Sequence, residues 1–124
     1  MLNIPQSDYA LIAEALHYRW DINARPKQHI PETQFFIWLI LAGRGFGKTR
    51  TGAETVRHWI KNNAYVNLIG ATADDARDIM IEGESGILAI CPENERPAYV
   101  ASKRRLEWPN GGISLIFTAD EPER

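Results

Sequence analysis

The first regular pattern along the chain is amphipathic and lies near the N-terminus. Tyr9, Ile12 and Leu16 recur at close to helical spacing, which predicts a helix over about residues 8–19. An Arg-Pro pair then ends the regularity, because the residue before a proline avoids the α region. We therefore expect residues 21–34, which contain two prolines, to form a connecting loop.

An unbroken apolar run, FFIWLIL, occupies residues 35–41. A half-buried strand alternates apolar and polar positions, so this run predicts a strand buried on both faces, as in a parallel sheet. The spacing of apolar residues predicts a helix over roughly 48–62. The residues expected on its core face are Ala53, Val56, Trp59 and Ile60, and those expected to point away are Glu54, Arg57 and Lys61.

The following stretch predicts a short strand and two short helices. Residues 65–70 form the strand, and Thr72 or Asp74 caps a helix that continues to about Met80. A second short helix is expected around residues 85–90. The alternation of strands and helices indicates an α/β fold.

The last third of the chain predicts a β-hairpin. Residues 99–108 and 113–118 are strand-like runs, and the sequence PNGG joins them at 109–112. An Asn-Gly pair between two such runs favours a tight turn, because both residues tolerate a positive φ.

Composition narrows the class of protein. The 124 residues include 14 Lys+Arg and 16 Asp+Glu, giving a formal charge of -2, which argues against a globally basic nucleic-acid binder. A single cysteine, Cys91, excludes an intramolecular disulfide and a zinc site built from several cysteines. The longest apolar run is far shorter than the roughly 20 residues that span a bilayer, and the N-terminus does not resemble a signal peptide. We expect one small cytoplasmic domain without membrane contact.

The candidate functional motif is AGRGFGKT at residues 42–49, a match to G-x-x-x-x-G-K-[ST] with Ala42 in the first position. Its glycines let the backbone curl so that successive N–H groups face an anion, and the following helix adds its N-terminal dipole. Lys48 is expected to reach the β- and γ-phosphates, and the Thr49 hydroxyl to bind Mg²⁺. The alternative is a glycine-rich turn with an incidental surface lysine. The position between a buried run and an amphipathic helix favours the phosphate-binding loop.

Several separated segments together resemble the large terminase subunit of tailed bacteriophages and prophages. They are Leu41–Glu54, Ile69–Gly86 and Ser102–Gly111, with Ala24–Gln28 similar to the family's entry segment. The resemblance covers about residues 20–124. It implies an ATP-driven motor that packages DNA into a procapsid, and a P-loop NTPase-like three-layer sandwich of the additional-strand type.

The resemblance also implies roles for individual residues. Lys48 and Arg44 would be catalytic, Thr49 would bind the metal, and Gln28 would read the adenine edge. Arg44 as a solvated loop side chain and Gln28 as an ordinary polar residue remain alternatives. The implied ATP-binding residues are Gln28, Gly43, Arg44, Gly45, Phe46, Gly47, Lys48 and Thr49.

By the same resemblance, residues 1–124 correspond to the N-terminal part of the ATPase domain, with a helix and entry segment at 1–34 and a P-loop core at 35–124. The nuclease domain and the Walker B Asp-Glu pair are not found, and we expect a truncated fragment. Asp120-Glu121 does not end a buried apolar strand, and neither does Glu82 or Glu84. Because phosphoryl transfer depends on positioning the attacking water, we expect little hydrolysis by the chain alone.

The implied cofactors are ATP and Mg²⁺, and the implied partners are double-stranded DNA, the small terminase subunit and the portal protein, in the cytoplasm of a bacterial host. Lys103-Arg104-Arg105 is the only basic run; a solvated strand face is favoured over a DNA contact. Arg77 and Arg124 are candidate arginine fingers, although surface roles are favoured for both. An open strand edge would promote self-association.

Two other functions remain open. A P-loop kinase of another class would need a phosphoacceptor pocket and lid arginines. A non-enzymatic prophage remnant would bind a partner protein without using nucleotide.

Overall fold

The computed structural model describes residues 6–41 and 47–121. Its contacts divide the chain into two compact units, Met1–Phe35 and Phe36–Arg124. The candidate phosphate-binding residues Lys48 and Thr49 belong to the second unit.

The N-terminal unit is helical. It contains α1 (Gln6–His17), α2 (Trp20–Asn23) and a 3-10 turn, η1 (Pro26–Gln28). The predicted first helix is confirmed as α1. The expectation of a connecting loop over 21–34 was wrong in part, because the end of α2 and all of η1 lie within it. Proline suits the first position of η1, since its fixed φ matches a helical turn and no N–H is needed there.

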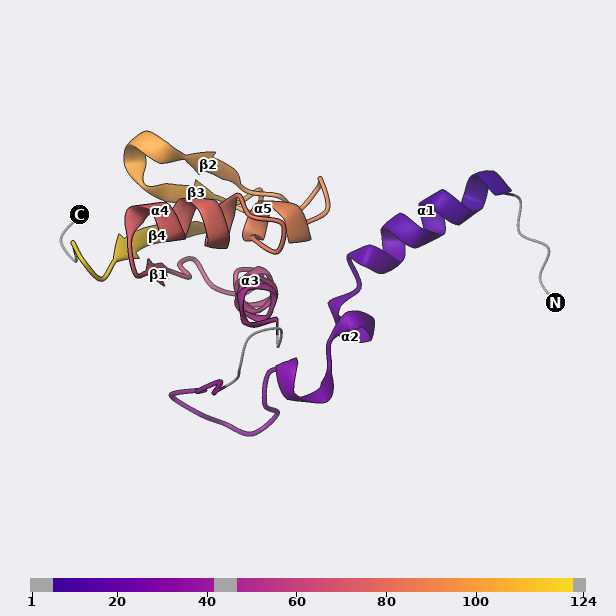
Figure 1. Ribbon diagram of the computed structural model, residues 1–124, viewed down its shortest axis with the longest axis horizontal. Coiled ribbons are helices and arrows are strands. Elements are labelled where there is room, and N and C mark those ends of the chain that lie inside the picture. The colour runs from indigo at the N-terminus through magenta and orange to yellow at the C-terminus, as the bar shows by residue number, and fades with distance from the viewer. Residues whose placement is uncertain (1–5, 42–46, 122–124) are drawn as a thin grey trace. The chain divides into compact units, whose positions relative to one another are not determined.

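The C-terminal unit is mixed α/β, which confirms the predicted α/β class (Figure 1). Its four-stranded sheet has the order β1-β4-β3-β2, with β1 parallel to β4 and the other pairs antiparallel. Its elements are α3 (Lys48–Trp59), β1 (Leu68–Gly70), α4 (Ala73–Asp75), the π-helix η2 (Ala76–Ile81), α5 (Ile87–Ile90), β2 (Ala98–Val100), the 3-10 turn η3 (Ala101–Lys103), β3 (Arg105–Glu107) and β4 (Ile113–Thr118).

Most of the short elements in this unit were predicted from local signals. The Thr72 hydroxyl accepts a hydrogen bond from the backbone N–H of Asp75 at 3.1 Å, so Thr72 is the cap that starts α4. The hairpin between β3 and β4 is confirmed, and Gly111 takes the positive φ, 89°, that its turn requires. The local sequence is thus sufficient to position these turns.

The predicted strand over residues 35–41 is not present. Residues 37–41 run as chain without regular structure and pair with no strand of the described sheet. Ile37 is 84% exposed and Leu41 86% exposed, whereas Trp38 and Ile40 are half-buried. A strand needs a neighbour that accepts its backbone hydrogen bonds, and without one only alternate side chains of this segment are covered.

The predicted strand over 99–108 is interrupted. Its two halves, β2 and β3, form their own antiparallel hairpin, with Tyr99 opposite Leu106. The connection is η3 followed by Arg104, which has a φ of 50°. Because an arginine occupies a position that usually carries glycine or asparagine, the sequence contains no signal for this turn.

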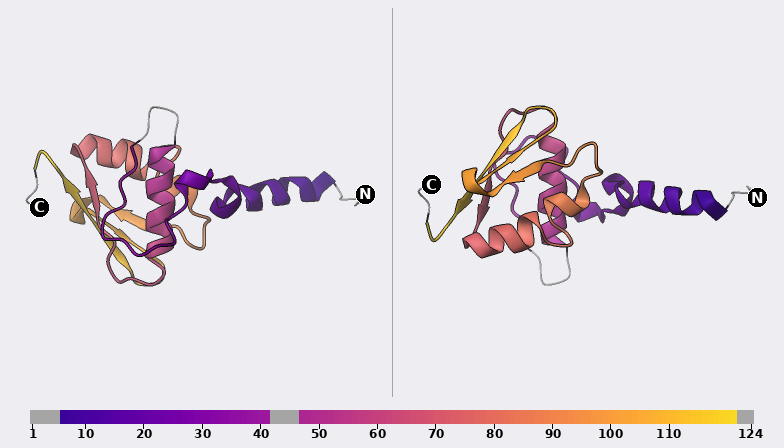
Figure 2. Two further views of the ribbon diagram at one scale, coloured as in Figure 1. Left: turned by 90° about the horizontal axis from the view of Figure 1, so that it is seen from below. Right: turned by 90° about the horizontal axis from the view of Figure 1, so that it is seen from above.

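The core lies between one face of the sheet and the helices α3, η2 and α5. Figure 2 shows α3 and the α4–η2 segment beside the sheet, in one view from below and one from above. Gly70 lets β1 approach η2 closely, since a Cβ there would lie 3.0 Å from the Cβ of Ala76. On the other face of β1, Ile69 is 70% exposed. The buried apolar residues are Ala53, Val56, Ile60, Leu68, Ala76, Ile81, Ile87, Ile90, Cys91, Leu106, Trp108 and Ile116.

Candidate phosphate-binding helix and its anchoring contacts

The start of α3 is where the sequence predicts phosphate binding. Gly47 precedes the helix with a φ of 86° and ψ of 36°, a left-handed conformation that glycine adopts readily. Its carbonyl oxygen accepts hydrogen bonds from the backbone N–H of Thr51 at 2.9 Å and from the Thr51 hydroxyl at 2.8 Å. The chain therefore turns sharply at Gly47 and is fixed to the first turn of α3.

The predicted residues Gly43, Arg44, Gly45 and Phe46 lie outside the described residues. Their assignment to the phosphate cradle therefore stays a prediction.

Lys48 and Thr49 occupy the first turn of α3, where Lys48 is exposed and Thr49 half-buried. This turn contains no acidic residue, so the positive end of the helix dipole is not offset there. Both residues line a cleft with a volume of about 350 Å³, which Trp38 and Ile40 help to enclose. An anion approaching the helix start would meet an ammonium group and a hydroxyl group.

Gln28 belongs to the N-terminal unit and is buried. Its side-chain carbonyl oxygen accepts a hydrogen bond from the backbone N–H of Arg25 at 2.8 Å and one from Arg25 Nε at 3.4 Å. These bonds cap η1. The predicted reading of an adenine edge is not tested by this geometry.

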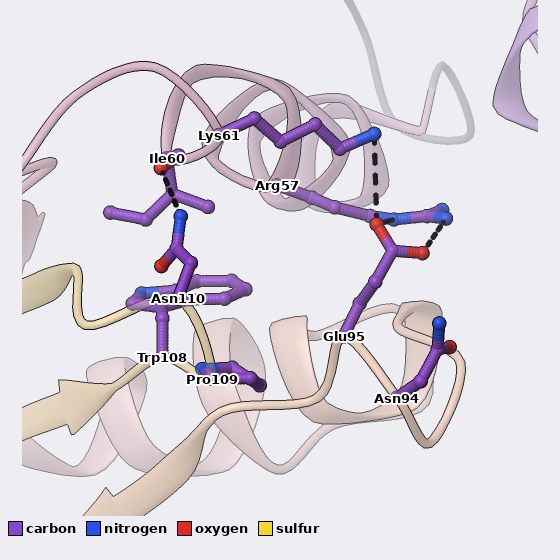
Figure 3. Close-up of a pocket in the computed structure, with 8 residues that line it drawn as sticks. All are labelled: Arg57, Ile60, Lys61, Asn94, Glu95, Trp108, Pro109 and Asn110. Carbon is purple, nitrogen blue, oxygen red and sulfur yellow. Dashed lines mark hydrogen bonds and ion pairs between the residues drawn. The ribbon is translucent and has the colours of Figure 1, made fainter.

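Two charged residues of α3 do not point away from the core as predicted. Glu54 is 3% exposed, and the Arg57 side chain lies between the carboxylates of Glu54 and Glu95. Arg57 Nη2 donates to Glu95 Oε2 at 2.8 Å (Figure 3). Arg57 Nη1 donates to Glu54 Oε1 at 3.3 Å. Lys61 Nζ lies 3.6 Å from Glu95 Oε1. We call these four residues, Glu54, Arg57, Lys61 and Glu95, the Arg57 clasp.

The two carboxyl groups of the clasp have pKa values shifted in opposite directions. Burial raises the pKa of Glu54, and the nearby Arg57 only partly offsets this effect. The hydrogen bond from Arg57 lowers the pKa of Glu95. Burial disfavours the charged form of Arg57, but its bonds to Glu95 and Glu54 outweigh burial and raise its pKa. Glu95 is therefore the better stabilised partner of Arg57.

Sequence reasoning missed the clasp because its partners are far apart along the chain. Arg57 and Glu95 are separated by 38 positions. A local sign of the clasp is the spacing of Glu54, Arg57 and Lys61, which places all three along one side of the helix, where they could share a partner.

The other candidate charged residues make local contacts. Arg77 Nε donates to Asp78 at 2.8 Å and Arg77 Nη2 to Asp74 at 3.0 Å, which gives Arg77 a surface role. Lys103 and Arg104 are exposed in the β2–β3 turn, in agreement with a solvated face. Within residues 6–41 and 47–121, no group of three or more His, Cys, Asp or Glu side chains is arranged to hold a metal ion. Arg124 lies outside the described residues.

None of the described helices combines the length and the apolar character needed to cross a bilayer.

The second unit is a mixed α/β domain in which α3 follows a glycine and starts with a lysine and a threonine. A family model described as "Terminase large subunit, T4likevirus-type, N-terminal" matches residues 39–124, more than half of the chain. The chain belongs to this family, which indicates a role in phage DNA packaging. No curated protein and no solved structure matches this chain.

Proposed function

We propose that this chain binds Mg·ATP through residues 42–49 and serves as the nucleotide-binding part of the phage DNA-packaging motor. The observation that carries the proposal is that α3 starts at Lys48, directly after the left-handed Gly47, inside the region that matches the terminase family. Lys48 would contact the β- and γ-phosphates, and the Thr49 hydroxyl would coordinate Mg²⁺. Arg44 would stabilise charge on the γ-phosphate.

The proposed partners are double-stranded DNA, the small terminase subunit and the portal protein. A net charge of -2 does not support strong general attraction to DNA, so contact with DNA would use local groups. A three-layer P-loop sandwich would place further structure on the face of β1 where Ile69 is exposed. The outer edge of β1 is also unpaired within the described sheet, which supports self-association.

Calorimetric titration with Mg·ADP and Mg·ATP tests the proposal. Wild-type protein should bind both nucleotides, and Lys48→Ala should abolish binding because the ammonium group contacts the phosphates. Thr49→Ala should weaken binding only when Mg²⁺ is present. His58→Ala removes an exposed side chain from the last turn of the same helix, and it should bind like the wild type. Equal binding by Lys48→Ala and wild type would contradict the proposal.

One observation favours a second candidate, a partner-binding module that does not use nucleotide. Apolar side chains of the segment before the loop and of β1 are exposed, including Ile37, Leu39, Leu41 and Ile69. Such surfaces mark protein interaction sites. A folded circular-dichroism spectrum together with no nucleotide binding by the wild type would favour this function, whereas phosphate transfer to a small molecule would indicate a kinase.

A further inference from the structure

Helix α3 has two different ends. Its start, at Lys48, is exposed and carries the candidate phosphate-binding residues. Its second half is fastened to other parts of the unit by charged and polar side chains. A helix of 12 residues is about 18 Å long. The candidate ligand site and the fastened end are therefore connected by one rigid element.

The C-terminal end of α3 and the residue after it contact two turns, the one before β2 and the one between β3 and β4. Arg57 binds Glu95 in the turn before β2, with Nη2 at 2.8 Å from Oε2 and Nε at 3.4 Å from Oε1. Asn110, in the turn between β3 and β4, donates from Nδ2 to the carbonyl oxygen of Ile60 at 2.9 Å. Figure 3 shows both contacts at one pocket, which Trp108 and Pro109 also line.

The turn that carries Glu95 is itself firmly held. The neighbouring Arg96 donates from Nε to the carbonyl oxygen of Leu88 and from Nη2 to that of Cys91, each at 2.9 Å. Only Arg96 and Pro97 separate Glu95 from β2. A movement of Arg57 would thus reach β2 without being absorbed by a long loop.

The clasp contains a carboxylate whose burial is unfavourable by itself. Glu54 is buried, and its Oε2 accepts no hydrogen bond from the described residues. Removing a carboxylate from water is unfavourable unless its oxygens are paired, and an apolar side chain of similar size often packs at lower cost. What the carboxylate does provide is a second contact that orients the Arg57 guanidinium toward Glu95. A planar fork held from two sides allows little movement.

We propose that Arg57 is a positioning residue that couples the nucleotide end of α3 to β2 and the β2–β3 turn through Glu95. The turn carries Lys103 and Arg104, and β3 begins at Arg105, so nucleotide binding at Lys48 would alter the order of a basic segment. This inference rests on the proposed nucleotide-binding function. The coupling acts from α3 to Glu95 and from there to β2.

Amide hydrogen exchange measured by mass spectrometry, with and without saturating Mg·ADP, tests the coupling. Peptides covering residues 47–59 report nucleotide binding itself, and peptides covering 98–105 report the coupling. In the wild type, Mg·ADP should slow exchange in both regions, by about 2- to 30-fold in 98–105, the range carried by packed networks. Glu95→Ala should keep the slowing in 47–59 and lose it in 98–105. Arg57→Lys, which keeps the charge but not the fork, should give the same result.

The control is Glu93→Ala, which removes an exposed carboxylate from the same turn and should behave like the wild type. A purely structural role for Glu95 would speed exchange in 98–105 equally with and without nucleotide, leaving the nucleotide-dependent difference intact. That result would overturn the inference, as would slowing confined to 47–59 in the wild type. Absence of slowing in both regions of the wild type would overturn the proposed function and the coupling together.

Discussion

Replacing glycine by alanine should change the free energy of unfolding in opposite directions at two positions of the C-terminal unit. Gly86 is buried at the start of α5, and a Cβ there would lie 2.8 Å from the carbonyl oxygen of Ile81 and 3.0 Å from that of Ile79. Its φ of -80° suits alanine, so Gly86→Ala causes no backbone strain and its cost comes from the steric clash. Because the crowding atoms are backbone atoms, they do not move aside easily. Gly86→Ala should lower the free energy of unfolding by about 1–3 kcal/mol, as for other overpacked sites.

Gly52 is the matched control. It lies in the middle of α3 and is exposed. Apart from its chain neighbours and the backbone of its own helix, no atom of the described residues lies within 4 Å of the position that a Cβ would take. Gly52→Ala should raise the free energy of unfolding by about 0.5–1 kcal/mol, because glycine loses more backbone entropy in a helix. Urea unfolding followed by tryptophan fluorescence measures both changes, with an unchanged m-value as the sign that only stability has altered. Shifts of the same sign in the two variants would refute the reasoning.

Two further predictions concern titrating groups. Because burial raises the pKa of Glu54 in the folded state above its unfolded value of 4.5, its ionisation lowers stability at neutral pH, and this penalty disappears as pH falls through the folded pKa toward 4.5. The stability of Glu54→Gln relative to wild type should therefore decrease on acidification in urea titrations, and a difference that is independent of pH would contradict this. Burial raises the pKa of the Cys91 thiol to about 12, so the folded protein should not react with a thiol reagent at pH 8, whereas the unfolded protein in urea should; fast labelling of the folded protein would show that the site is open.

The features that could be predicted from the sequence depend on residues close together in the chain. Thr72 caps α4 through a bond to a residue three positions away, and Gly111 supplies the positive φ of the β3–β4 turn. Gly47 and Lys48 likewise mark the start of α3 by local chemistry. In each case one or two residues determine the backbone conformation, so the pattern alone is sufficient.

The features that could not be predicted depend on distant partners. An apolar run at 35–41 shows that the chain can form a strand, but not that a neighbouring strand is available to pair with it. Apolar spacing in α3 shows which side chains prefer the core, but the burial of Glu54 depends on Arg57 and on the distant Glu95. In the π-helix η2 each hydrogen bond spans five residues instead of the four of the α-helix expected there, and no residue type signals this change.

The C-terminal unit reverses the usual distribution of side chains at two places. A carboxylate, Glu54, is buried, while Ile37, Leu41 and Ile69 are largely exposed. Neither feature favours the stability of this unit by itself, since a buried charge costs desolvation and exposed apolar area contributes no burial. Departures of this kind are expected where a sequence serves function as well as folding. The buried charge orients a contact between α3 and the strands, and the exposed apolar surface offers an area for association. Both fit the proposed function, in which nucleotide binding at the start of α3 would act together with partner molecules.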